Sequence, residues 1–523
     1  MILKIYSFVC LILLYIPIFS QNNDSLVKKI DLNYKNTEEK LAFTKTDLSN
    51  PDNVVSLLLS SYEKGNVYSD VKALQQINDC VKILKQEING KSEVKKVKYV
   101  YDYVHKQFLK VYKLQNSFSD IFTKGEYNCV SASALYAIIY TKLDIPFNVI
   151  EAPQHVYLVT YPQSFKILIE TTSPEKGYYQ FNDNFIHQYI KSLYNSKLIS
   201  KSEYESNTAN QLFDKYYFSS KGLTLPEVVS LQYSNYSIYY LEEKKYSEAI
   251  DEIKKAYYLN PYDRNKYILK STLIFNVQNN KYEKKEQVEN LALLCRFRIQ
   301  NDDELSNEFL KNEFLRLTES QLINNSNYSL YDESYKIIIQ EISDTVLNNE
   351  ISYSYHHELA RLGYLNNKDS AYELPHLRAA YNINPKNANL QGIILSYLER
   401  EVKGKNDPRD IIKLMDLYSK YFDFTNENNG FNGVKANCIL ELSYQSFAVN
   451  DINKGETYLK EFENLINTKK DTKANDTFIE KAYSFAAGVY YKKGNIAKAR
   501  QTLKNGLIYS PDNFGLKLRL NQL

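Results

Sequence analysis

Hydrophobic residues along most of this chain recur at intervals of three and four, the spacing of one buried face of an α-helix. One such face is formed by Leu74, Ile77, Val81, Leu84 and Ile88. Gly90 follows and predicts the end of this helix, because glycine readily ends helices. Residues 97–112 repeat the same spacing and predict another helix.

A third helix is predicted to begin at Cys129. Asn128 precedes it as a favourable N-cap, and Ile145-Pro146 marks its end. The spacing then changes to that of strands. Residues 147–152, 155–161 and 165–172 are rich in β-branched and aromatic residues and predict an antiparallel sheet.

From about residue 190 the pattern is helical to the end, and an internal repeat is visible. The segments "KKAYYLNP", "LRAAYNINP" and "KNGLIYSP" each carry a small residue five positions before the proline. These small residues are Ala256, Ala380 and Gly506. In the first and last copies a second alanine, Ala249 or Ala499, lies seven positions earlier. Tyr240 and Tyr490 lie nine positions before Ala249 and Ala499, whereas the middle copy has Glu373 in place of the earlier alanine.

This pattern resembles the tetratricopeptide repeat. The resemblance covers 233–266 and 483–514 well and 359–390 in part, with a further worn copy at 446–465. It implies an α-solenoid from about residue 230 to the C-terminus, an architecture that commonly binds protein partners.

The N-terminus has the layout of an export signal. Lys4 precedes an apolar run from Ile5 to Phe19, and polar sequence begins after Ser20-Gln21. The run is shorter than the roughly 20 residues that span a bilayer, which favours a cleaved signal over an uncleaved anchor. We therefore expect an exported protein, periplasmic or secreted, with a flexible lead-in at 21–50.

Charge and cysteine content exclude several classes. A net charge of +3 over 523 residues makes no basic field, so a nucleic-acid partner is not expected. The cysteines beyond the signal, Cys80, Cys129, Cys295 and Cys438, show no Cys-x-x-Cys spacing and are too few for a disulfide scaffold. No calcium-type acidic cluster, metal-binding histidine spacing or phosphate loop is present, and we expect no metal or cofactor.

Cys129 differs from the other cysteines in the residues that follow it. His155 opens the second predicted strand, and Glu170 lies within the third. If the hairpin turns at 162–163, His155 and Glu170 face each other directly on one side of the sheet. A shift of one residue would place Glu170 on the opposite face.

This order of residues is suited to nucleophilic catalysis. A helix N-terminus and a neighbouring imidazolium stabilise a thiolate, and a carboxylate fixes the histidine tautomer. The Cys129 backbone N–H would donate to the developing oxyanion. Gln154, Gln107 and Tyr127 remain equal candidates for a second donor.

The segments "GEYNCVSASALYAIIYTKLDIPFNVIEAPQHVYLVTY" and "KILIETTSP" resemble the transglutaminase-like core, a papain-related cysteine fold. Residues 97–108 are similar to the family's lead-in helix. The resemblance implies Cys129 as nucleophile, His155 as general base and acid, and Glu170 as orienting acid. Some bacterial members join this core to tetratricopeptide repeats. The chain departs from the family in having Glu170 where Asp is usual, and in having no Trp.

Two functions follow as hypotheses. The first is acyl transfer from an amide or peptide through a Cys129 thioester, to water or to an amine. The alternative is a catalytically inactive scaffold for protein–protein interaction, since cysteine and histidine are also common structural residues. A site blocked by Tyr127 or Tyr157 would favour the scaffold.

The predicted fold is thus an α+β papain/transglutaminase-like core followed by an all-α solenoid. Its expected divisions are 1–20 signal peptide, 21–50 lead-in, 51–190 transglutaminase-like domain, 191–232 helical connector and 233–523 tetratricopeptide-like repeats.

Overall fold

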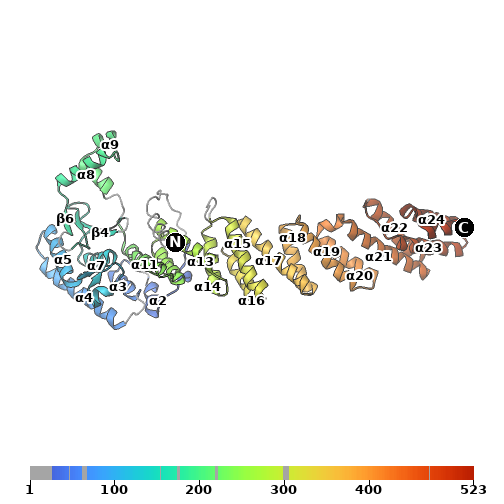
Figure 1. Cartoon of the computed structure of the whole chain (residues 1–523), viewed down its shortest axis with the longest axis horizontal. Coiled ribbons are helices and arrows are strands. Elements are labelled where there is room, and N and C mark those ends of the chain that lie inside the picture. Colours follow the sequence, from blue (N-terminus) through green and yellow to red (C-terminus); the bar gives the residue numbers. More distant parts are fainter. Residues whose placement is uncertain are drawn as a thin grey trace. The chain divides into compact units, whose positions relative to one another are not determined.

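The computed structural model of the chain separates into two compact units, residues 1–297 and 298–523 (Figure 1). The structure describes residues 26–45, 47–61, 67–152, 155–173, 177–217, 222–298, 305–469 and 471–523. The predicted export signal at 1–20 lies outside the described residues. The described chain is predominantly helical with small sheets, as the hydrophobic spacing predicts.

The first unit contains both sheets and about half of the helices. Its helices are η1 (Lys29–Asp31), α2 (Thr37–Thr44), α3 (Pro51–Ser60), α4 (Val67–Glu87), α5 (Glu93–Phe108), α6 (Asp120–Thr123), α7 (Cys129–Lys142), α8 (Asp183–Asn195), α9 (Lys201–Ser206), α10 (Ala209–Tyr217), α11 (Leu225–Glu242), α12 (Tyr246–Leu259), α13 (Asp263–Asn279) and α14 (Lys285–Arg296). Its strands are β1 (Val111–Tyr112), β2 (Glu126–Tyr127), β3 (Phe147–Ala152), β4 (His155–Thr160), β5 (Ile167–Ile169) and β6 (Tyr178–Gln180).

In the described part of the second unit, every regular element is a helix. Its elements are α15 (Asn307–Thr318), η2 (Glu319–Asn324), α16 (Tyr328–Ile339), α17 (Thr345–Leu365), α18 (Ser370–Ile383), α19 (Ala388–Lys403), α20 (Pro408–Tyr421), η3 (Asp423–Glu427), α21 (Asn429–Ala448), α22 (Ile452–Thr468), α23 (Asp476–Lys492), α24 (Ile496–Tyr509) and α25 (Phe514–Gln522).

The predicted antiparallel sheet is present, with one strand more than expected. Strands β3, β4, β5 and β6 pair in that order, each antiparallel to the next. Helix α7 packs against β4 and β3 and is buried on almost every side, so it forms the centre of this layer. A second, parallel pair, β1 with β2, was not predicted from the sequence.

The predicted register of the hairpin is wrong by two residues. Leu158 pairs with Ile169, so His155 and Glu170 are diagonal neighbours and do not face each other directly. The six residues 161–166 form the turn, because Lys166 N–H and Ser164 N–H both donate to the Tyr161 carbonyl, each at 3.0 Å. Because strand faces alternate with a period of two, a shift of two residues leaves both side chains on the same face.

Two further expectations differ from the structure. The helix predicted over 97–112 ends at Phe108, because the N–H groups of Lys110 and Val111 donate to the Gly125 carbonyl and begin β1. The lead-in at 21–50, predicted as flexible, contains η1 and α2 in its described part. Glu39 of α2 is fully buried and receives hydrogen bonds from Lys255 and Tyr233, both at 3.0 Å.

Small residues stand where paired helices come close, as the repeat pattern predicts. Ser237 donates a hydrogen bond to the Ala249 carbonyl across the α11–α12 pair. Ser443 donates in the same way to the Gly455 carbonyl across α21–α22, where a Cβ on Gly455 would lie 2.6 Å from the Phe447 ring. Close helix pairs of this kind fit the tetratricopeptide resemblance, which itself stays a prediction.

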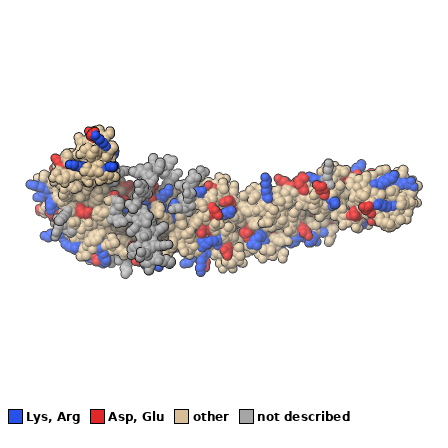
Figure 2. All heavy atoms as spheres, turned by 45° about the horizontal axis from the view of Figure 1, so that its top comes forward, with Lys and Arg blue, Asp and Glu red and all other residues tan. Residues whose placement is uncertain are grey.

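Charged side chains of both signs are interspersed on the surface. Figure 2 shows Lys and Arg beside Asp and Glu over the described part of the face in view. This distribution agrees with the small net charge of the sequence. A search of the described residues found no helix with the length and apolar character needed to cross a membrane.

Replacement of Glu39 tests the role of the ordered lead-in. Glu39→Ala would leave the buried Lys255 ammonium with one carboxylate partner, Glu252, instead of two. Breaking a buried ion pair from one side costs about 3 kcal/mol. We expect the free energy of unfolding, measured by urea titration, to fall by roughly that amount. The exposed neighbour substitution Glu38→Ala is the control, and an equal effect of both would contradict the prediction.

Candidate functional site

Cys129 is the first residue of α7, and local interactions fix this helix end. The Asn128 side chain accepts a hydrogen bond from the Ser131 N–H at 2.9 Å, and the Ser131 hydroxyl accepts from the Asn128 N–H at 3.0 Å. This reciprocal cap starts the helix at Cys129 as the sequence predicts. Cys129 therefore stands at the positive end of the helix dipole, with its side chain half-buried.

His155 and Glu170 meet on one face of the sheet. His155 is the first residue of β4, and Glu170 directly follows β5. The His155 Nε2 atom lies 2.5 Å from a Glu170 carboxylate oxygen. The longer Glu side chain thus reaches the histidine from its diagonal position.

The Cys129 thiol completes the line of three groups. It lies within interaction range of His155 and is the leading cause of the raised pKa of that imidazole. Because Nε2 faces Glu170, the ring nitrogen available to the sulfur is Nδ1. The structure therefore brings all three predicted site residues together in the order sulfur, imidazole, carboxylate.

These contacts favour a positively charged histidine. The interaction with Cys129, and next the hydrogen bond with Glu170, raise the pKa of His155 to about 10 against the opposing effect of burial. Burial by itself would raise the pKa of Glu170, but hydrogen bonds from His155 and Thr172 outweigh burial and lower it. The pair is thus an imidazolium and a carboxylate at neutral pH.

Helix α5 holds the segment that carries Glu170. The Tyr101 hydroxyl donates to the Ser173 carbonyl at 3.0 Å, and His105 Nε2 lies 3.1 Å from the Thr171 carbonyl. Thr172 donates to the second Glu170 carboxylate oxygen from its N–H, at 3.0 Å, and from its hydroxyl, at 2.6 Å. Gly177 is required here, because a Cβ would lie 2.0 Å from the Glu170 carbonyl.

Solvent reaches the site. The side chains of His155 and Glu170 are 32% and 24% exposed. Tyr157 stacks beside the His155 ring, with 6.2 Å between centroids, and Tyr127 is buried against Tyr112. With both tyrosines in these places, the histidine and its carboxylate keep exposed surface.

Of the three candidates for a second oxyanion donor, Gln107 is exposed on α5, Tyr127 is buried, and Gln154 lies outside the described residues. Two other tyrosines, which the sequence did not indicate, lie near Cys129 in the structure. Tyr112 in β1 and Tyr239 in α11 both lie within electrostatic range of Cys129. Only the β1–β2 pairing and the packing of α11 on α7 reveal them.

The remaining cysteines and histidines lie elsewhere. Cys80, Cys295 and Cys438 are buried, and burial raises the pKa of Cys80 to about 12 and that of Cys438 to about 11. The Nδ1 atoms of His356 and His376 lie 2.9 Å apart, and burial lowers the pKa of both rings. Among the described residues no group of three or more His, Cys, Asp or Glu side chains forms a metal site.

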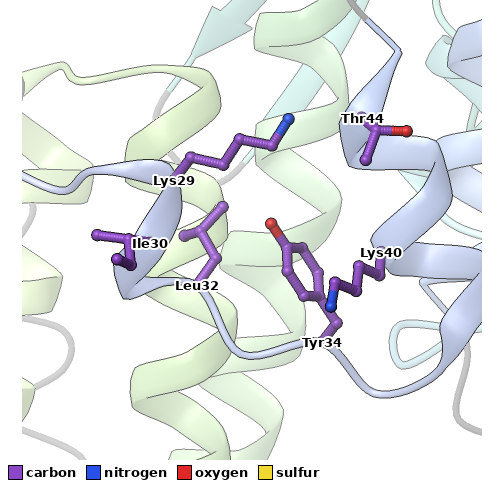
Figure 3. A pocket seen from close by; sticks show the side chains of 6 residues that line it. All are labelled: Lys29, Ile30, Leu32, Tyr34, Lys40 and Thr44. Carbon is purple, nitrogen blue, oxygen red and sulfur yellow. The ribbon is translucent and has the colours of Figure 1, made fainter.

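A separate pocket lies in the N-terminal segment (Figure 3). Its volume is about 370 Å³, and its lining includes Lys29, Leu32, Tyr34 and Lys40. None of the three site residues lines it, and it brings no nucleophile or acid–base pair together. The candidate site is therefore the exposed triad on α7, β4 and the end of β5.

The protonation of His155 gives a test of the arrangement. A folded-state pKa near 10 against an ordinary 6.5 means that this ion pair stabilises the fold fully below pH 6.5, and that the stabilisation is lost as pH rises toward 10. We expect the His155 C2-proton resonance, followed by NMR, to titrate near pH 10. Glu170→Gln should lower that midpoint toward 6.5.

Asp144→Asn provides the matched control, because it makes the same carboxylate-to-amide change on the exposed turn after α7. It should leave the His155 midpoint unchanged. A wild-type midpoint near 6.5 would contradict the contacts described for His155.

Comparisons with known families and curated proteins give no match for this chain. The function of the chain is therefore inferred from the arrangement of its own residues.

Proposed function

We propose that this chain is a transglutaminase-like cysteine protein that transfers or hydrolyses acyl groups of an amide or peptide through a thioester on Cys129. The observation that carries the proposal is the grouping of three side chains: His155 hydrogen-bonds with Glu170, and the Cys129 thiol lies close enough to be the leading cause of the raised pKa of the same imidazole. An activated cysteine of this kind needs a base within hydrogen-bond reach and a third group that orients the base. All three are present and reach solvent.

The reaction would run in two balanced steps. The Cys129 thiolate attacks the carbonyl carbon of the amide, and the carbonyl electron pair moves onto oxygen. The intermediate collapses as the C–N bond breaks, and the leaving amine takes the His155 proton. Water or a second amine then attacks the thioester and gives its proton to His155, which releases the product and restores the thiolate.

Glu170 would support both steps by holding His155 as the positive ion. Thr172 occupies one carboxylate oxygen of Glu170 and His155 the other, so the carboxylate is fixed in one orientation. A fixed carboxylate sets the tautomer of the imidazole and stabilises its charge. The substitution of Glu for the family's usual Asp is thus accommodated by this local anchoring.

The remaining parts of the proposal rest on sequence resemblance. The core would have a papain/transglutaminase-like fold, and the later helices would be tetratricopeptide repeats that bind a protein or peptide partner. The apolar run at 5–19 would direct export of a bacterial protein to the periplasm or the exterior. A scaffold without turnover is the alternative, and the same experiment decides between the two.

The experiment measures thiol reactivity at Cys129. We expect iodoacetamide to alkylate Cys129 rapidly below pH 7, and we expect His155→Ala to slow that reaction about 100-fold at pH 6. The reason is that an unassisted thiol, with an ordinary pKa near 8.5, is less than about 1% thiolate there. Mass spectrometry locates and counts the label over pH 4–9.

Cys80, Cys295 and Cys438 are internal controls, because these buried thiols should stay unlabelled while the protein is folded. Glu170→Gln should give an intermediate rate. Equal alkylation of Cys129 with and without His155, or labelling only near pH 8.5, would refute the enzyme and favour the scaffold.

A further inference from the structure

Acyl transfer at Cys129 needs a second hydrogen-bond donor for the oxyanion. The backbone N–H of Cys129 supplies one donor, since the first N–H groups of a helix have no partner within the helix. Of the candidates named from the sequence that the structure describes, Tyr127 is buried away from substrate and Gln107 is an exposed residue of α5. A side chain close to Cys129, exposed to substrate and carrying a free proton would fill the role.

Tyr112 meets these requirements through the β1–β2 pair. In that parallel pair Tyr112 is the register partner of Tyr127, two residues before Cys129. The Lys113 N–H donates to the Tyr127 carbonyl at 2.8 Å, and the Tyr112 and Tyr127 rings meet edge to face at 5.9 Å. These contacts hold Tyr112 beside the start of α7.

Tyr112 lies within electrostatic range of the groups of the site. Burial, followed by the charges of Cys129 and Glu170, raises the pKa of Tyr112, so the hydroxyl keeps its proton at neutral pH. Tyr112 also lies within electrostatic range of Tyr239, which hydrogen-bonds with the Asn128 cap. Groups at the start of α7, just after β5 and on α11 thus lie within electrostatic range of this phenol.

The Tyr112 hydroxyl is available to a ligand. The side chain is 47% exposed, unlike that of Tyr127, which is 2% exposed. The Tyr239 hydroxyl, by contrast, is committed, because it donates to the Leu114 carbonyl at 2.8 Å. Within the described residues the Tyr112 hydroxyl donates no hydrogen bond to another protein group.

We propose that Tyr112 is a catalytic residue whose hydroxyl donates the second hydrogen bond to the oxyanion formed when Cys129 attacks a carbonyl. The inference rests on the proposed function, because it requires Cys129 to be the nucleophile. As the C–S bond forms, the carbonyl electron pair moves onto oxygen, which accepts hydrogen bonds from the Cys129 N–H and the Tyr112 hydroxyl. When the leaving group departs, the carbonyl re-forms and both donors are released.

Two reagents separate this role from the reactivity of the thiol. p-Nitrophenyl acetate acylates a thiolate through a tetrahedral oxyanion and releases p-nitrophenolate, whereas iodoacetamide alkylates it by displacement of iodide without forming an oxyanion. Both rates at Cys129 are measured on the full chain, and Cys129→Ala supplies the background. Mass spectrometry confirms the acetylated residue.

We expect Tyr112→Phe to slow acetylation of Cys129 about 100-fold, the usual effect of removing one oxyanion donor. Alkylation by iodoacetamide should change less than about twofold, because the thiolate is unaffected. Tyr103→Phe is the matched control, since Tyr103 is a half-buried tyrosine on α5 near Cys80. It should leave both rates unchanged.

The other outcomes show whether the inference alone, or the proposed function as well, is wrong. Normal acetylation of Tyr112→Phe, or a larger loss in Tyr127→Phe, would refute the role of Tyr112 and leave the proposed function standing. Parallel loss of both rates in Tyr112→Phe would assign Tyr112 to thiol activation and also refute the inference. Slow alkylation of wild-type Cys129 would refute the proposed function and the inference with it.

Discussion

The hydrogen bond between His155 and Glu170 depends on the short segment that follows β5. Strand β5 ends at Ile169, so strand pairing alone does not hold Glu170 in place. The segment is held by α5, whose Tyr101 and His105 contact its carbonyl groups, and by Thr172, which occupies one carboxylate oxygen. Anchoring of this kind matters because a carboxylate that can rotate cannot fix the charge or tautomer of a histidine.

Helices α11 and α13, which follow the sheet in the sequence, pack in the same compact unit as the candidate site. Leu223, just before α11, pairs with Val149 of β3, and α11 carries Tyr239 to the Asn128 cap. Near the start of α13, Arg264 forms an ion pair with Glu151 at the end of β3. These contacts join α11 and α13 to the sheet within the first compact unit, which extends to residue 297, past the point where the repeat-like helices begin.

The electrostatics of the site follow from the order of its groups. A sulfur and a carboxylate on opposite sides of one imidazole both favour the protonated ring, whereas His105, buried and facing a carbonyl and a hydroxyl, has its pKa lowered mainly by burial. Asp102 acts on His105 as well, but its effect is smaller than that of burial, whereas the neighbours of His155 outweigh burial. His155 is therefore a candidate acid–base group, whereas His105 holds the backbone at Thr171 in place.

The sequence by itself determined the helical character, the start of α7 at Cys129 and the strands β3 and β4, because these follow from local spacing and capping. It also selected Cys129, His155 and Glu170 as candidates, through an assumed hairpin and a family resemblance, and the structure places the three near one another. The tertiary structure alone decided the six-residue turn that shifted the hairpin register, the β1–β2 pair and the place of Tyr112. It also decided the burial of Glu39, whose partner Lys255 is 216 residues away. Such features depend on contacts between segments distant in the chain, and no local pattern of residues encodes which distant segment will meet which.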